Sequence, residues 1–131
     1  MKFTLLLYGD ESFWAESTPE QIAETMGVWE AFDRELTEAG VMLGGEGLTP
    51  TTEATTVRIA GGDVVHTDGP FAETREQLGG FYLLDCRDLD EAIRWAAKIP
   101  GAQGGTIEVR PVMDYEAAGM STEAEVHEGA R

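Results

Sequence analysis

The stretch TDGPFAETREQLGGF, residues 67–81, gathers side chains that could carry chemistry, and a histidine precedes it directly. His66 and Asp68 are separated by one residue, so an extended backbone would project both to one side. A carboxylate beside an imidazole can orient the ring as a general base. The alternative is a histidine at the end of a hairpin with one face in solvent.

Asp68 itself has two readings. A carboxylate on a turn at the mouth of a pocket can bind a cation, a hydroxyl or an ammonium group, or take a proton from a carbon acid. An Asp before Gly69-Pro70 can instead cap its own turn by accepting backbone N–H bonds. The residue types alone leave both readings open.

Three further residues of the stretch could bind a ligand. Phe71 could be a substrate platform, although the commoner role is a plug that ties a loop to the core. Glu73 and Arg75 would supply an acceptor and a fixed cation, which can hold a small anionic substrate, or they form a solvated face. Tyr8, at the end of an apolar run, could assist His66 or Asp68 in proton transfer.

The elements that position these residues follow from the hydrophobic periodicity. Residues 2–8 form an apolar run that is typical of a buried strand. Thr18 can cap a helix with Pro19 at its first position, and Gly40 ends that helix. Its apolar residues recur at helical spacing, so we expect all five to anchor it: Ile22, Met26, Trp29, Phe32 and Leu36.

The rest of the chain alternates strands with a second helix. Residues 55–60 and 64–66 flank Gly61-Gly62-Asp63, a turn that predicts a hairpin. We also expect an irregular, glycine-broken strand over 41–48, a strand over 79–86 and a strand over 106–113. Between the last two, Asp88 caps a second helix and Pro100-Gly101 ends it. This helix has four apolar residues on one face: Leu89, Ala92, Ile93 and Ala96. This order predicts an α+β fold with two helices on one face of an antiparallel sheet.

Length and composition indicate one domain and exclude several function classes. The chain has 131 residues and a formal charge of −16, so we expect neither direct nucleic-acid nor membrane binding. A single cysteine, Cys86, and no signal peptide or apolar span favour a soluble cytoplasmic protein. We expect the domain to end at residue 113, followed by a flexible acidic tail over 114–131 that contains His127, the second of only two histidines.

A half-covered sheet also predicts an assembly. A small chain cannot leave a broad apolar sheet face in water without a partner. We therefore expect a homodimer whose two sheets face each other, with any pocket lying between a sheet and the partner copy.

Four strings in consistent order carry a family resemblance: MKFTLLLYGDE, VMLGGEGLTP, TDGPFAETREQLGGFYLLD and IEVRPV. Residues 1–113 resemble the DGPF group of the YCII-related proteins. This resemblance implies a ferredoxin-like βαββαβ core of the dimeric α/β barrel superfamily, a bacterial source and an association with extracytoplasmic-function sigma factors. Related proteins use a histidine near the start of the first helix, but residues 18–40 contain none, so any chemistry here needs other residues.

Two functions of different classes follow. The first is a cofactor-independent enzyme of isomerase or lyase type that transfers a proton on a small organic molecule, with Asp68 as acid/base, His66 or Tyr8 assisting and Arg75 holding an anion. The second is a non-catalytic ligand-binding or interaction module linked to sigma-factor regulation. We expect no metal and no cofactor, because the sequence lacks ligand-spaced His or Cys pairs and nucleotide-binding motifs.

Overall fold

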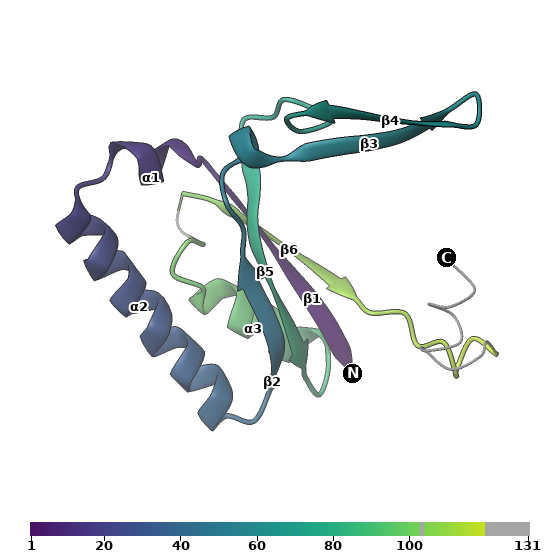
Figure 1. Cartoon of the computed structure of the whole chain (residues 1–131). Coiled ribbons are helices and arrows are strands. Elements are labelled where there is room, and N and C mark those ends of the chain that lie inside the picture. Colours follow the sequence, from purple (N-terminus) through teal and green to yellow (C-terminus); the bar gives the residue numbers. More distant parts are fainter. Residues whose placement is uncertain (103, 120–131) are drawn as a thin grey trace.

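The computed structural model describes residues 1–102 and 104–119, which form a four-stranded sheet, its helices and a separate hairpin (Figure 1). The elements in chain order are β1 (Lys2–Gly9), α1 (Ser12–Glu16), α2 (Pro19–Glu38), β2 (Met42–Gly47), a 3₁₀ turn (Thr51–Glu53), β3 (Thr55–Ala60), β4 (Asp63–Asp68), β5 (Gln77–Asp85), α3 (Leu89–Lys98) and β6 (Thr106–Pro111).

The main sheet has the strand order β2-β5-β1-β6, and every neighbouring pair is antiparallel. With α2 between β1 and β2 and α3 between β5 and β6, this is the ferredoxin-like βαββαβ arrangement. The predicted α+β fold is confirmed. The β3–β4 hairpin is an insertion between the second and third strands of that core.

Local signals placed the helix starts correctly. Thr18 and Gln21 form a reciprocal capping box, in which each side chain accepts the backbone N–H of the other residue. Asp88 caps α3 by accepting the N–H of Glu91. The chain leaves α2 through Gly40, whose φ of 73° favours glycine.

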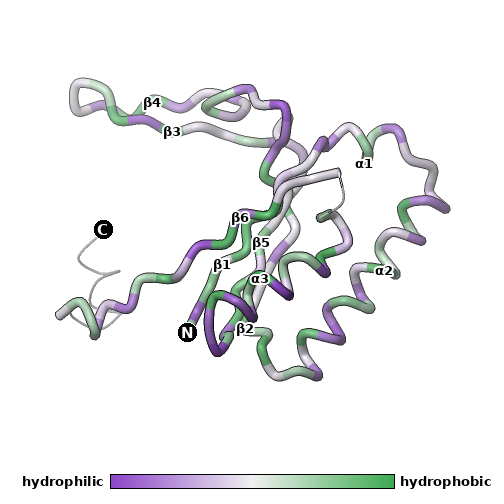
Figure 2. Tube along the Cα trace, turned by 180° about the vertical axis from the view of Figure 1, so that it is seen from behind, coloured by the Kyte–Doolittle hydropathy of each residue, from purple (hydrophilic) through white to green (hydrophobic). Residues whose placement is uncertain are grey.

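The core lies between the sheet and the helices. Fully buried side chains on β1 and β5, among them Phe3, Leu5 and Leu84, meet Phe32 and Leu36 of α2. The apolar stretches of the main strands are visible along the tube in Figure 2. None of the helices in the described part of the chain lies on the opposite face of the sheet (Figure 1).

The helices are anchored by fewer residues than their periodicity predicts. In α2 only Phe32 and Leu36 are buried, whereas Ile22 and Trp29 are half-buried and Met26 is 46% exposed. The expectation of five buried anchors was therefore wrong, because only the carboxyl-terminal half of α2 packs closely on the core.

Helix α3 also buries fewer apolar residues than its periodicity predicts. Ala92 and Ala96 of α3 are buried, but Leu89 and Ile93 remain about half exposed. Among the described residues, no helix is both long and apolar enough to cross a bilayer. The predicted tail over 114–131 is described only as far as residue 119, and His127 lies outside the described residues.

We call the β3–β4 hairpin, residues 55–68, the arm. Its strands pair from Thr55 with Asp68 to Ala60 with Asp63, and the turn Gly61-Gly62 has positive φ at both residues, as a tight hairpin turn requires. The arm extends from one end of the main sheet away from α1 and α2, in both views (Figures 1 and 2).

Candidate functional site

The helix-free face of the main sheet, here called the open face, brings Tyr8 close to an acid from the far end of the chain. The Tyr8 hydroxyl donates a hydrogen bond to Glu108 Oε1 over 3.5 Å. Tyr8 pairs with Thr106 across the β1–β6 ladder, so Glu108 is its diagonal neighbour on the same face. The structure thus gives one predicted site residue, Tyr8, an acidic partner.

Strand register explains what surrounds this pair. Glu108 lies opposite Leu6, Leu6 opposite Phe81, and Phe81 opposite Glu46. Residues directly opposite in an antiparallel ladder share a face, so these four form one row across the open face. Two half-buried apolar side chains therefore lie between two exposed carboxylates.

The neighbouring row adds a cation. Thr4 lies between Leu83 on β5 and Arg110 on β6. Arg110 follows Glu108 by two residues, so both side chains project from the same face of β6. The open face thus combines a hydroxyl, a carboxylate and a guanidinium around apolar side chains.

The structure places His66 and Asp68 on β4 of the arm, where both are exposed. They share one face of the arm, as their spacing predicts, and Val57 and Thr55 lie opposite them on β3. Within the described residues, the Asp68 carboxylate accepts no hydrogen bond and contacts neither His66 nor Tyr8 in an ion pair or hydrogen bond.

The turn that follows Asp68 is held by hydrogen bonds of the Gly69 backbone and not by the Asp68 carboxylate. Gly69 donates its N–H to the carbonyl of Ala54 over 2.7 Å, and its own carbonyl accepts from Thr56 Oγ1 at 2.8 Å. Gly69 has a φ of 98°, a conformation that favours glycine. The turn-cap reading of Asp68 is therefore wrong, and its carboxylate is available to other partners.

The residues after the turn line a shallow hollow of about 460 Å³. Its walls combine polar and apolar surface and come from the 3₁₀ turn, the loop that follows the arm and the start of β5: Thr51, Thr52, Gly69, Pro70, Ala72, Glu73, Thr74 and Gln77. Glu73 thus faces a hollow, while Arg75 is exposed. Phe71 is 79% exposed, so the expectation that it plugs the loop into the core was wrong.

A hydrogen-bond network around Glu11 joins three of the residues that line this hollow, Thr51, Thr74 and Gln77. The Glu11 carboxylate accepts the N–H of Thr51 at 2.9 Å and also the Thr51 hydroxyl. The N–H of Glu11 donates to Gln77 Oε1 over 3.1 Å, and Gln77 Nε2 donates to the carbonyl of Thr74. The base of the arm is thereby tied to the end of β1 and the start of β5.

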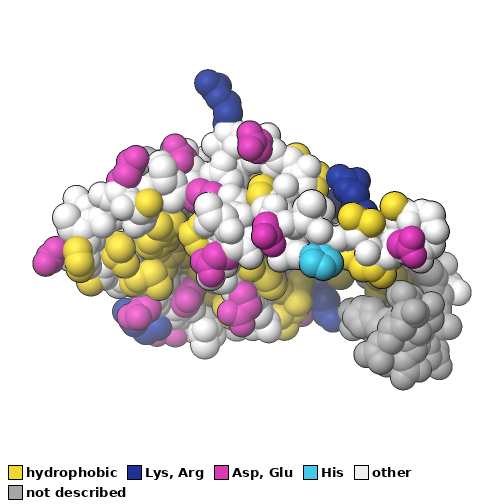
Figure 3. All heavy atoms as spheres, turned by 45° about the horizontal axis from the view of Figure 1, so that its top comes forward, with side chains coloured by type: hydrophobic (Ala, Val, Ile, Leu, Met, Phe, Trp, Pro, Cys, Tyr) yellow, Lys and Arg dark blue, Asp and Glu magenta, His cyan; other side chains and the backbone are white. Residues whose placement is uncertain are grey.

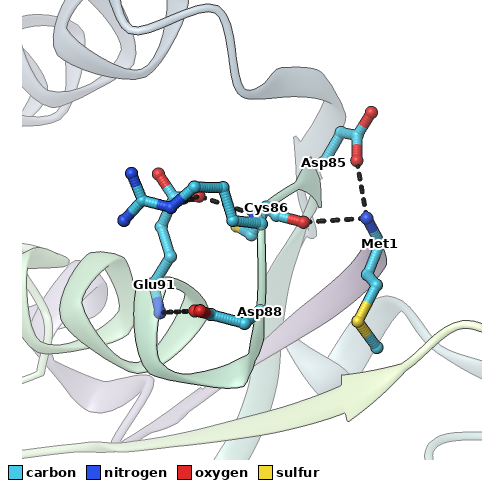
Figure 4. Close-up of polar contacts among 6 residues, drawn as sticks. Met1, Asp85, Cys86, Asp88 and Glu91 are labelled. Carbon is cyan, nitrogen blue, oxygen red and sulfur yellow. Dashed lines mark hydrogen bonds and ion pairs between the residues drawn. The ribbon is translucent and has the colours of Figure 1, made fainter.

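A second hollow, of about 530 Å³, lies where the amino terminus meets the segment after β6. The Met1 ammonium donates to Asp85 Oδ1 over 3.1 Å and to the carbonyl of Cys86 over 2.8 Å (Figure 4). Cys86 itself is 2% exposed. Burial, and then the negative charges of Glu91 and Asp85, raise the pKa of the Cys86 thiol, so it is a poor nucleophile.

The most strongly perturbed phenol belongs to the core. The Tyr82 hydroxyl donates to Asp33 Oδ1 over 2.5 Å, and burial followed by this hydrogen bond raises the pKa of Tyr82 well above its ordinary range. Phe32 and Trp29 both pack against the Tyr82 ring. Tyr82 points to the helix face, so this pair supports the fold.

The sequence analysis did not identify three residues of the open face: Glu46, Glu108 and Arg110. The alternation in TIEVRP places Glu108 and Arg110 on one face of a strand, and that signal could have identified them. Their pairing with β1 and β5 is long-range, and no local pattern gives it. Within residues 1–102 and 104–119, no three His, Cys, Asp or Glu side chains gather in a way that could hold a metal ion.

Comparisons with known proteins agree with this architecture. The family model for the YCII-related domain matches residues 1–116. An uncharacterized protein of Rhizobium meliloti (strain 1021) is 42% identical over 118 residues, which cover 88% of this chain and 95% of that protein. The matched region contains every strand of the main sheet, the arm and the loop that follows it. On this evidence the chain belongs to the family of YCII-related domain proteins.

Proposed function

We propose that this protein binds a small organic molecule on the open face of its sheet and transfers a proton on it, as a cofactor-independent isomerase or lyase does. The observation that carries this proposal is the Tyr8–Glu108 hydrogen bond beside Leu6 and Phe81. In proton transfer at carbon, a carboxylate can act as the base and a phenol as a hydrogen-bond donor.

The two groups would divide the reaction between them. The Glu108 carboxylate takes a proton from a carbon next to a carbonyl, and the electron pair of the broken C–H bond moves onto the carbonyl oxygen. The Tyr8 hydroxyl donates a hydrogen bond to the enolate oxygen that forms. Returning the proton to a different carbon completes an isomerisation, while loss of a leaving group from the enolate completes an elimination.

A second copy of the chain would enclose this chemistry. Leu6, Phe81 and Leu83 are only partly buried in one copy, and a second sheet facing them would exclude water from the Tyr8–Glu108 pair. Proton transfer and charge stabilisation are both stronger where water is excluded. The homodimer is therefore part of this proposal.

The residues around the arm would have a binding role in the same proposal. Asp68 and His66 offer an acid and a base, and Glu73 and Arg75 offer an acceptor and a cation at the loop hollow. Phe71 is exposed and free to stack on a ligand. These side chains would orient a polar or anionic end of the molecule.

A second candidate function is an interaction module linked to an extracytoplasmic-function sigma factor. The observation that favours it is the exposed apolar face of the arm, described below, which suits a protein surface. This candidate needs no chemistry at Glu108.

Hydrogen exchange at carbon separates the two candidates. The protein would be incubated in D₂O with a panel of unsaturated lactones and β-keto acids, and C–H to C–D exchange followed by NMR. We expect exchange on at least one panel member and a loss of about 100-fold or more in Glu108→Gln. Tyr8→Phe should also slow it.

Glu46→Gln is the matched control, because Glu46 ends the same row but no described hydrogen bond joins it to a hydroxyl. It should retain most of the exchange. Equal losses in the two Glu→Gln variants, or no exchange above the uncatalysed rate with any compound, would contradict the enzymatic proposal.

A further inference from the structure

We propose that the arm is a clasp that packs its apolar face onto a second copy of this chain. The inference rests on the homodimer of the proposed function, but it assigns a separate contact to a separate element. Three features of the arm support this contact: its register, the distribution of charge on its two faces and its place in the fold.

One face of the arm is apolar toward its tip and exposed. Ile59 and Val64 lie directly opposite each other, and Val57 lies on the same face opposite His66. Val57, Ile59 and Val64 are 61%, 68% and 66% exposed, which is unusual for neighbouring β-branched side chains. Figure 3 shows hydrophobic side chains gathered on this projecting part of the molecule.

Two of the three charged residues of the arm, Arg58 and Asp63, lie on its other face, whereas Asp68 lies at the base of the apolar face. Arg58 is opposite Val65, and Asp63 is opposite Ala60, so both charges project away from the apolar face. On β3 the residues Val57, Arg58 and Ile59 alternate between the two faces, as in a strand that covers a core with one face. On β4 the two valines project to opposite faces, so the tip of the arm is more apolar on the side of Ile59 and Val64. In one copy of the chain, the residues that the structure describes form no such core over it.

The small net charge of the arm makes it better suited to contact a second copy than the acidic parts of the surface. Two chains of charge −16 repel each other wherever their acidic surfaces approach. Residues 55–68 contain one base, Arg58, and two acids, Asp63 and Asp68, so the formal charge of the arm is only −1. The arm can approach a second copy at lower electrostatic cost than the acidic helices.

The direction of the arm makes it continuous with the open face. It leaves the sheet away from α1 and α2, on the side that the helices do not cover (Figure 1). A second copy seated on the open face would therefore lie within reach of the arm. By two-fold symmetry each copy would clasp the other, so one contact would be made twice.

A contact with a second copy would stabilise the arm. A two-stranded hairpin is at best marginally stable alone in water, and both of its strands have an unpaired edge. A stable interface buries roughly 800 Å² on each partner. The three apolar arm residues add to Leu6, Phe81 and Leu83 of the open face, and together they provide the apolar centre of such an interface.

The test compares two neighbouring valines on opposite faces of the arm. Dimer dissociation constants would be measured by sedimentation equilibrium for the full-length chain, Val64→Asp and Val65→Asp. We expect Val64→Asp to weaken the dimer at least about tenfold, because it places an unpaired carboxylate in an apolar contact. Val65→Asp should change the constant less than about threefold. Circular dichroism and the thermal midpoint would verify folding.

A shortened arm gives an independent second variant. Deleting residues 57–60 and 63–66 leaves Thr56 and Thr67 beside the turn Gly61-Gly62 and keeps the bonds at the base of the arm. This variant should weaken the dimer at least as much as Val64→Asp. The contrast between Val64→Asp and Val65→Asp should be the same in a Glu108→Gln background, so a failure of the proposed chemistry would not be mistaken for a failure of the clasp.

Three outcomes would overturn the inference. They are a single-chain mass for the unmodified protein at all concentrations, equal effects of the two valine variants, and an unchanged constant after shortening of the arm. The first of these would leave another class of protein as the occupant of the apolar face.

Discussion

Tyr8 donates a hydrogen bond to Glu108 across 100 residues of sequence, with 3.5 Å between the two oxygens. The contact exists because β6 pairs with β1 and places Glu108 diagonally across from Tyr8 on the face that the helices leave open. The two residues proposed to transfer the proton thus lie on strands of the main sheet, whereas the more conspicuous His66 and Asp68 lie on the exposed arm. The account of function depends on this difference.

The two glycines at 79 and 80 should differ sharply in their tolerance of a side chain. A Cβ at Gly80 would lie 2.8 Å from the Glu46 carbonyl oxygen, a backbone atom that cannot move away easily. We expect Gly80→Ala to reduce the free energy of unfolding by about 1–3 kcal/mol. At roughly 4 °C per kcal/mol, scanning calorimetry would detect this.

Gly79→Ala is the control, since its added Cβ would meet only the Leu7 carbonyl oxygen at 3.9 Å. Its free energy of unfolding should change by less than about 0.5 kcal/mol. An equal loss in both variants would show that the close approach of β2 to β5 is not the cause.

Asp68→Asn should leave stability nearly unchanged. The carboxylate accepts no hydrogen bond from the described residues, so the expected change is within about 0.5 kcal/mol. Gly69→Ala, one residue later, should cost about 1–3 kcal/mol because φ is 98° there. Urea unfolding would measure the free energy of unfolding of both variants. A loss in Asp68→Asn as large as that in Gly69→Ala would show that the Asp68 carboxylate caps the turn.

Tyr82→Phe should lower the free energy of unfolding by about 1–3 kcal/mol near neutral pH, because it leaves Asp33 without the hydrogen bond from the Tyr82 hydroxyl. The pKa of Tyr82 is raised in the folded protein, so above about pH 10 the unfolded phenol ionises while the folded one keeps its proton. The contribution of the hydroxyl is complete below that pH and declines above it.

The stability difference between the unmodified protein and Tyr82→Phe should therefore shrink as pH rises beyond 10. Urea titrations at several alkaline pH values would measure it. A difference that stays constant or grows would contradict the assigned cause of the shift.

Cys86 should react slowly while the protein is folded. It is buried, and burial with the charges of Glu91 and Asp85 raises the pKa of its thiol. At pH 8 we expect Ellman's reagent to react at least about tenfold more slowly with the native chain than with the chain in urea, where one thiol per chain should be counted. A native rate that matches the denatured rate would show that the thiol is accessible.

The sequence predicts what local chemistry controls. The caps at Thr18 and Asp88, the turn at Gly61-Gly62 and the succession of strands and helices along the chain were all correct, because each depends on residues close in sequence. The short helix α1 was missed, since its five residues are too few to show a period and none of them is buried.

Long-range geometry accounts for the other differences. Periodicity shows that Met26 and Ile93 are on the apolar side of a helix, but not whether the sheet extends beneath them. The exposure of Phe71 depends on how the loop leaves the arm. Glu108 could be placed beside Tyr8 only once the β1–β6 pairing was known.

The most direct test of the central claim is the mass and shape of the protein in dilute solution, measured by small-angle X-ray scattering. The account predicts twice the chain mass and a compact particle for the unmodified protein, and a single-chain mass for Phe81→Glu, which places a charge in the middle of the open face. A single-chain mass without any substitution, or a Phe81→Glu dimer as stable as the original, would contradict the closure of two sheets over Tyr8 and Glu108.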